Sequence, residues 1–360
     1  MKFNISLFKI SFCFFCIKAF LSSKYLYIHI FLPYFKIFII EYSILFIHEF
    51  IHYITALVLG FKVSSFYLIP FNICKEKSKF KISFIKDNFI TSRIHFYSIN
   101  LSSKFEYNIL LKKLRVYFWL GPIFDFIIFV ILFSFGVANI SYSYLVLVSI
   151  IHFFISSINF FNSDGKYAIG LKEDSRIAFD VVRNCTLCGD GDVSHNTKGI
   201  MTDIHMEIAK SISIEPFDVN DLWNFLNNTS FYTNSIISFL NKDIFTLHPS
   251  TLIFLNNLQN DFDSIKQFDY RQVEKTSIAI LYYLIFEKIS NASFIPKEAI
   301  VEKIFKGIKD NYYKKLYNLF FNNEVESIQF LLNKDNMPAS ISTIEGHNKL
   351  LLNLVNIYKK

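Results

Sequence analysis

Two histidines four residues apart, His48 and His52, enclose a glutamate, Glu49, in the pattern HExxH. On an α-helix, residues four apart lie on the same face, so both imidazoles can bind one metal ion. The intervening carboxylate can then act as a general base toward water activated by that ion. The spacing therefore predicts a zinc site with His48 and His52 as ligands and Glu49 as the catalytic residue.

The residues around this motif are strongly apolar. The stretch 35–59 is long enough to cross a bilayer, since about 20 residues rising 1.5 Å each span the hydrocarbon core. Histidine and glutamate are costly inside such a helix and usually functional there, whereas the alternative is a polar cluster satisfied by neighbouring helices. Glu41, seven residues before His48, faces the same side. It can support a ligand histidine or reach the outer membrane interface.

Several further elements are predicted to position the motif. An N-terminal membrane segment covers residues 1–34, with a helix break expected at Pro33. Two more apolar spans cover residues 117–137 and 142–161, and the short uncharged link between them makes them an antiparallel pair. Between residues 61 and 97, short β-prone runs predict a small hairpin or sheet against the membrane face. We therefore expect about four transmembrane helices.

Charge is distributed unevenly along the chain. Residues 1–165 hold 16 of the 37 Lys and Arg residues but 7 of the 30 Asp and Glu residues, so this apolar half has a net charge of +9 and the rest of the chain −2. Such an excess in loops favours a membrane protein over a nucleic-acid-binding one. The basic loop after Gly60 is expected to stay in the cytoplasm. That topology places the end of the 142–161 span, and everything after Gly165, in the cytoplasm too.

A catalytic zinc ion usually has three protein ligands and one open position, so a third ligand must come from elsewhere in the chain. Asp164 follows the last span, on the same predicted side of the membrane as His52. Asp125 and His152 lie inside the other spans and fit the depth of His52 less well. His152 is also typical of a packed, hydrogen-bonded helix residue. The topology favours Asp164 among the three.

In chain order, four features resemble the site-2 protease family of intramembrane zinc metalloproteases. HEFIH lies in an apolar helix that ends in ALVLG at Gly60, and a β-prone stretch follows it. GPIFD at residues 121–125 is similar to the family's GPxxN, with Asp125 at the Asn position. The segment from Asn159 to Gly165 is similar to the family's NxxPxxxxDG, although the proline is missing and the spacing is shorter. The similarity covers residues 35–170, under half of the chain.

The resemblance implies an α-helical integral membrane protein whose zinc ion is held by His48, His52 and Asp164. It gives Asn159 a substrate-binding role, which the altered spacing leaves open between Asn159 and Asn162. It also implies cleavage of a membrane-embedded peptide or protein, either a membrane-bound regulator or a signal-peptide-like segment. We expect a bacterial cell membrane as the location, the lipid bilayer and that substrate as partners, and no nucleic acid.

Residues 171–360 form a second region, predicted to be a mostly helical, soluble domain on the cytoplasmic side. Cys185 and Cys188 form a CxxC pair within it. A zinc site needs two more ligands, and five scattered cysteines do not predict a disulfide framework, so packed thiols are favoured. In a competing hypothesis, the chain is a catalytically inactive membrane receptor or immunity-type protein that binds a partner through this domain. The retained Glu49 favours the enzyme.

Overall fold

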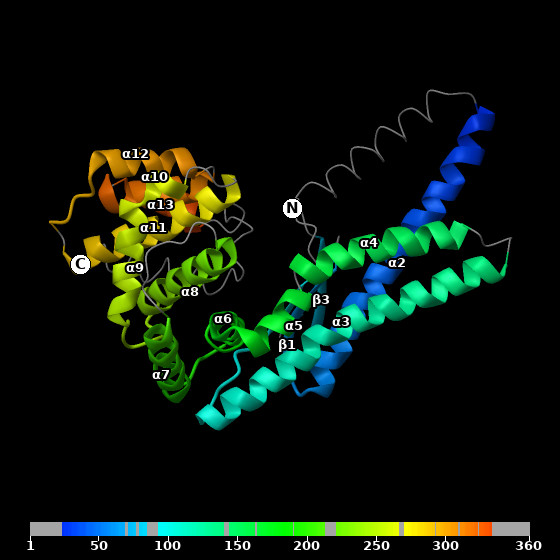
Figure 1. Cartoon of the computed structure of the whole chain (residues 1–360), viewed down its shortest axis with the longest axis horizontal. Helices are drawn as coiled ribbons and strands as arrows, with labels where there is room; N and C mark the ends of the chain where they lie inside the picture. Colours follow the sequence, from blue (N-terminus) through cyan, green and yellow to red (C-terminus); the bar gives the residue numbers. More distant parts are fainter. Residues whose placement is uncertain are drawn as a thin grey trace. The chain divides into compact units, whose positions relative to one another are not determined.

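The structure is a computed structural model of the chain (Figure 1). By its internal contacts the chain divides into a first unit, Met1–His95 with Leu114–Ile169, and a second unit, Phe96–Lys113 with Gly170–Lys360. Of the N-terminal segment expected over residues 1–34, residues 1–23 lie outside the described residues, and the domain boundaries after residues 34 and 170 stay a prediction. The structure describes residues 24–332 except for 69–70, 77–78, 85–92, 140–143, 163, 190, 213–220, 266–269, 292, 309 and 323.

Three long helices build the first unit: α2 (Lys24–Val58), α3 (Lys104–Ala138), which begins in the second unit, and α4 (Tyr144–Asn162). α2 continues through Pro33, so the helix break expected there is wrong. One missing backbone hydrogen bond is tolerated in a long apolar helix because the rest of its ladder remains. α3 and α4 lie side by side (Figure 1), with the rings of Phe129 and Phe153 4.9 Å apart between centroids.

These three helices turn polar side chains inward and apolar side chains outward. On α2, His48 and His52 are 9% and 3% exposed, whereas Phe50 between them is 44% exposed. Asp125 on α3 and His152 on α4 are buried in the same way, and large apolar side chains on both helices are exposed. A water-soluble bundle has the opposite arrangement, so this surface suits a hydrocarbon environment.

The number of membrane spans is only partly supported. Within the described part of the chain, one helix, α3, is long and apolar enough to cross a membrane by length and composition. The apolar stretch Tyr144–Phe154 of α4 is shorter than that criterion. The total of four spans therefore stays a prediction.

A small sheet follows α2 directly. The helix ends in a Schellman arrangement, in which the Phe61 N–H donates to the Ala56 carbonyl and Gly60 takes a φ of 82° that glycine adopts without strain. Strands β1 (Val63–Leu68), β2 (Phe71–Glu76), β3 (Lys79–Phe84) and β4 (Arg93–Phe96) pair in the order β3-β2-β1-β4. β1, β2 and β3 form an antiparallel meander. The sheet agrees with the small hairpin or sheet expected between residues 61 and 97.

The second unit is helical. Its central helix is α11, in which every residue from Ala279 to Ile285 is buried. A helix enclosed on all sides needs an apolar sequence around its whole circumference, and ILYYLI supplies it. The helices of this unit, with α5 beginning in the first unit, are α5 (Asp164–Glu173), α6 (Ser175–Thr186), α7 (His195–Ser211), α8 (Leu222–Leu240), α9 (Pro249–Asn260), α10 (Phe262–Ile265), α11 (Tyr270–Ser290), α12 (Glu298–Gly307), α13 (Asn311–Phe321) and α14 (Ser327–Leu332).

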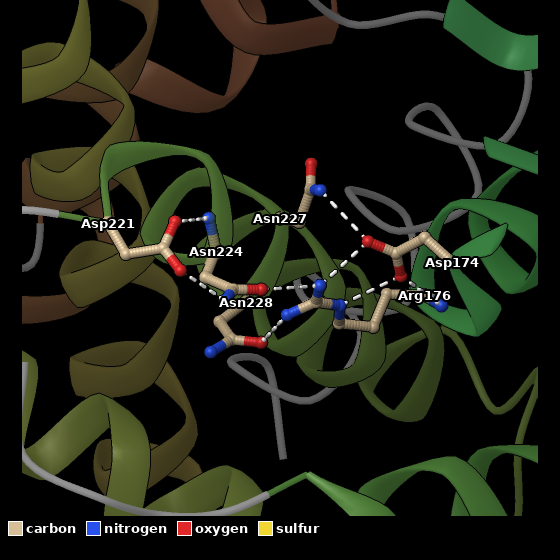
Figure 2. A network of polar contacts seen from close by, with 6 residues as sticks. All are labelled: Asp174, Arg176, Asp221, Asn224, Asn227 and Asn228. Carbon is tan, nitrogen blue, oxygen red and sulfur yellow. Dashed lines mark hydrogen bonds and ion pairs between the residues drawn. The ribbon is translucent and has the colours of Figure 1, made fainter. Parts of the chain in front are cut away.

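A polar cluster fastens α6 to α8 within the second unit (Figure 2). Asp174 caps α6 by accepting the Arg176 N–H, and it also pairs with the Arg176 guanidinium at 2.7 Å. The guanidinium donates in turn to Asn224 and Asn228 on α8. Asn227 Nδ2 donates to Asp174 Oδ2 at 3.0 Å. Because all three guanidinium nitrogens donate within the cluster, we interpret it as a structural tie between the two helices.

Candidate metal centre

The two histidines of the HExxH motif lie one turn apart on the buried face of α2. Their ring centroids are 4.9 Å apart, as expected for residues four apart on a helix. Ile44 and Ala56 are buried on the same stripe, so packing against neighbouring helices fixes which way the imidazoles face. Glu49 belongs to the same turn and is half-buried. The local sequence thus presents two ring nitrogens and one carboxylate from a single turn.

Asp164, the first residue of α5, completes the group. Its Oδ2 atom lies 3.1 Å from His52 Nε2 and 3.4 Å from His48 Nε2. Among the described residues, these three side chains form the one group of His, Cys, Asp and Glu whose donor atoms, one from each residue, all lie within 4.8 Å of one another. The structure therefore brings together the three residues that were predicted as ligands.

The donor set suits zinc. Imidazole nitrogen and carboxylate oxygen are common zinc ligands, with bonds of about 2.0–2.1 Å. Two such donors on a tetrahedral ion lie about 3.3 Å apart, on the same geometry, and the two nitrogen–oxygen separations of 3.1 and 3.4 Å match that value. His48, His52 and Asp164 would hold the ion, and three protein ligands leave the fourth position for water or substrate, as a catalytic site needs.

Gly121 on α3 makes room for the two imidazoles. A Cβ atom at this position would lie 2.4 Å from His52 Nε2 and 2.9 Å from His48 Cε1, so a larger residue would displace the rings. Tyr117, one turn earlier on α3, covers His52 with a ring-centroid separation of 4.8 Å. Neither contact was predicted from the sequence. A glycine inside an apolar helix is the signal that indicates a close helix–helix approach.

The remaining predicted residues lie outside the donor group. Asp125 Oδ1 is 2.8 Å from His48 Nδ1, the ring nitrogen that faces away from Asp164, and His152 lies beyond Asp125. Neither is placed to act as the third ligand. Asn159 lies in the last turn of α4, and its side chain is not among those described.

The CxxC pair belongs to the second unit. Cys185 and Cys188 are both buried, and the structure shows no disulfide at either residue. Burial raises the pKa of the Cys185 thiol to about 12, which keeps it protonated at neutral pH and a poor metal ligand. No third donor joins the pair among the described residues. This environment agrees with packed thiols.

The donor group, the apolar helices and the ordered motifs agree with one known family. Residues 36–329 match the profile of peptidase family M50. The chain belongs to peptidase family M50. This is the site-2 protease family, so the resemblance inferred from four sequence features is confirmed. M50 members are membrane-embedded metallopeptidases that generally depend on zinc. No curated protein and no solved structure matched the chain.

Proposed function

We propose that this M50 chain is a zinc-dependent intramembrane endopeptidase. The convergence of His48, His52 and Asp164 among apolar helices, at the separations of a tetrahedral ion, is the observation that carries the proposal. When bound, a zinc ion supplies a Lewis acid that polarises the peptide carbonyl and lowers the pKa of water to about 7.

The chain's own residues supply the proton transfers and the orientation of substrate. Glu49 accepts a proton from the attacking water and returns it to the amine as the peptide bond breaks. It directly follows His48 in the helical turn that carries both histidines. Asn159 is assigned to bind the substrate backbone, as its place in the family-like segment suggests.

The substrate in this proposal is a membrane-embedded segment, from a membrane-bound regulator or a signal-peptide-like sequence. An intact helix shields its carbonyls with internal hydrogen bonds, so the segment must unwind before cleavage. The sheet that follows α2 has β3 and β4 at its edges. An edge strand can hold an unwound segment in extended form by strand addition.

The proposed organisation has an N-terminal membrane segment (1–34), a protease core (35–170) with spans near 35–59, 117–137 and 142–161, and a helical cytoplasmic domain (171–360). The basic loop after Gly60 supports this orientation. A bacterial cell membrane is the proposed location. The rival hypothesis, an inactive receptor or immunity-type protein, needs neither Glu49 nor a complete donor group, and the chain retains both.

The decisive experiment compares the wild type with Glu49→Gln and with the control Glu298→Gln, an identical exchange at an exposed position of α12. Each protein is purified in detergent, analysed for zinc, and incubated with a panel of transmembrane peptides. We expect about one zinc per chain in all three and cleavage that falls about 10²–10⁴-fold in Glu49→Gln alone, the usual contribution of a general base.

Two results would contradict the proposal. A wild-type chain that takes up no zinc when the metal is supplied would exclude the metal site. Cleavage that survives in Glu49→Gln would exclude Glu49 as the base.

A further inference from the structure

Three ionisable side chains outside the donor group are also buried or partly buried, one on each of α2, α3 and α4. Asp125 on α3 and His152 on α4 are 7% and 5% exposed, and the Glu41 side chain on α2 is 18% exposed. Ionisable residues are costly inside apolar helices, and they persist there when they pair with one another or serve a function. Sequence analysis left open whether Glu41 supports a ligand histidine or reaches the membrane interface. Among the described residues, the ionic partner of Glu41 is His152, whose Nδ1 lies 3.5 Å from Glu41 Oε2.

Asp125 contacts the side of His48 that faces away from the donor group. His48 Nδ1 lies 2.8 Å from Asp125 Oδ1, while His48 Nε2 lies 3.4 Å from Asp164 Oδ2. An ionised carboxylate only accepts hydrogen bonds, so the Nδ1–H of His48 donates to Asp125. In the neutral ring that binds zinc, the lone pair is then on Nε2, the nitrogen that faces the donor group.

His152 continues the series of contacts behind Asp125. Its Nε2 lies 3.8 Å from Asp125 Oδ1, and its Nδ1 lies 3.5 Å from Glu41 Oε2. Ser156, one turn later on α4, lies 3.4 Å from the same Nε2. His152 therefore stands between two carboxylates. The contacts start on α2 at Glu41, pass through α4 and α3, and return to α2 at His48.

His52 is held differently. Its Nδ1 is buried and has no hydrogen-bond partner among the described residues. The ring is instead confined by Tyr117 and by the backbone at Gly121. Among the described residues, the contacts from Glu41 through His152 and Asp125 thus reach His48 and not His52. This asymmetry indicates that they act on His48.

We propose that Asp125, His152 and Glu41 form a positioning array that fixes the ring orientation and tautomer of His48, so that Nε2 is presented to zinc. Asp125 acts on His48 directly, and His152 and Glu41 act through Asp125. The proposal rests on the proposed function, because it assumes a zinc ion at the donor group. In metal sites, such carboxylate partners of ligand histidines typically change metal affinity about 10–100-fold.

The test measures zinc affinity by competition with a chromophoric chelator, for the full chain in detergent. Asp125→Ala is expected to bind zinc about 10–100-fold more weakly than the wild type. Asp125→Asn keeps an oxygen acceptor and should recover part of the loss. His152→Phe should weaken binding less than Asp125→Ala, and the double variant should be no weaker than Asp125→Ala, because residues acting through a common partner are not additive.

Ser149→Ala is the matched control, since Ser149 is a fully buried polar residue one turn before His152 on α4 and, within the described part of the chain, donates to its own helix at the Val146 carbonyl. It should bind zinc as the wild type does. A second readout uses zinc-loaded protein, in which the ¹⁵N shifts of histidine-labelled protein report which ring nitrogen of His48 carries the proton, assigned by comparison with His48→Gln. We expect the Nδ1–H form in the wild type and its loss in Asp125→Ala, even where a variant is less stable.

The outcomes separate the two proposals. Wild-type zinc affinity in Asp125→Ala, or an unchanged His48 tautomer, would overturn the positioning array and leave the protease proposal standing. Full additivity of Asp125→Ala and His152→Phe would remove His152 and Glu41 from the array. A wild type that binds no zinc would end the protease proposal, and the array proposal with it.

Discussion

In the first unit, α2, α3 and α4 bury histidines and carboxylates and expose phenylalanine and isoleucine, whereas in the second unit α11 buries Ala279, Leu281 and Leu284 and the polar residues lie mostly outside. The same backbone geometry serves both units. What differs is the solvent that each surface suits: hydrocarbon for the first unit and water for the second. In a hydrocarbon environment, a polar interior is the exception that needs a chemical reason.

Buried histidines make the comparison sharper. In the first unit, His48, His52 and His152 each face a carboxylate oxygen. In the second unit, His205 is fully buried but faces neutral groups: Ser235 Oγ lies 3.2 Å from Nδ1, and Nε2 accepts the His248 N–H at 3.4 Å. Burial of a histidine is therefore not by itself evidence of function. Convergence on shared carboxylates is the feature that distinguishes the metal centre.

The largest expected effect comes from exchanging the two kinds of histidine for alanine. His52→Ala removes one of the three donors, so it should abolish zinc binding and cleavage. The second unit should stay folded. His205→Ala should leave zinc binding intact but lower the free energy of unfolding by about 2–4 kcal/mol, as for other large-to-small core changes. Zinc analysis and thermal unfolding of both variants check this. If both variants lost zinc binding, or if both lost stability and kept zinc, the distinction between the two kinds of buried histidine would be wrong.

A smaller effect is expected at the glycine beside the imidazoles. Gly121→Ala places a Cβ 2.4 Å from His52 Nε2, so the ring must move and zinc affinity should fall about 10-fold or more, as when ligand orientation is disturbed. Gly199→Ala on α7 is the control, because its nearest neighbour would be Phe245 Cε2 at 3.9 Å. It should gain about 0.5–1 kcal/mol of stability from helix propensity. Chelator competition gives the zinc affinity of both variants, and unfolding measurements give their stability. Equal zinc affinity in the two variants would contradict the close approach of Gly121 to His52.

The smallest effect is a pH dependence confined to the second unit. Burial, with a contribution from the nearby His248, lowers the pKa of His205 to about 4. The unfolded chain binds a proton near pH 6.5 while the folded chain does not, so this contribution to stability is complete above pH 6.5 and is lost as pH falls toward 4. It should amount to about 1 kcal/mol between pH 6.5 and 5.5, given 1.36 kcal/mol per pKa unit. Unfolding of wild type and His205→Asn at both pH values gives the difference, and identical pH slopes would refute it.

Local periodicity was enough to predict the two histidines and Glu49 on one helical turn, because four-residue spacing alone determines a shared face. Asp164 needed a further argument from membrane topology, and the structure places it against both rings. The helical character of the second half and a sheet after Gly60 also followed from sequence patterns. These features depend on short segments or on the direction in which the chain crosses the membrane.

The missed features depend on how helices pack. The approach of Gly121 to His52 and the pairing of Asp125 with His48 require the register of α3 against α2, which no single-helix pattern contains. Asp125 was weighed as a ligand because its depth was known only roughly. Pro33 was expected to end a helix, as it does in water, but the apolar helix continues through it.

The donors of the metal centre are far apart in the chain, since 112 residues separate His52 from Asp164. A ribosome must therefore make α3 and α4 after the HExxH turn before the last donor emerges. During synthesis the two histidines exist for a long interval without their carboxylate. If the group binds zinc as proposed, all three ligands exist together only after α3 and α4 have been made, so tight binding of the ion can occur only late in synthesis.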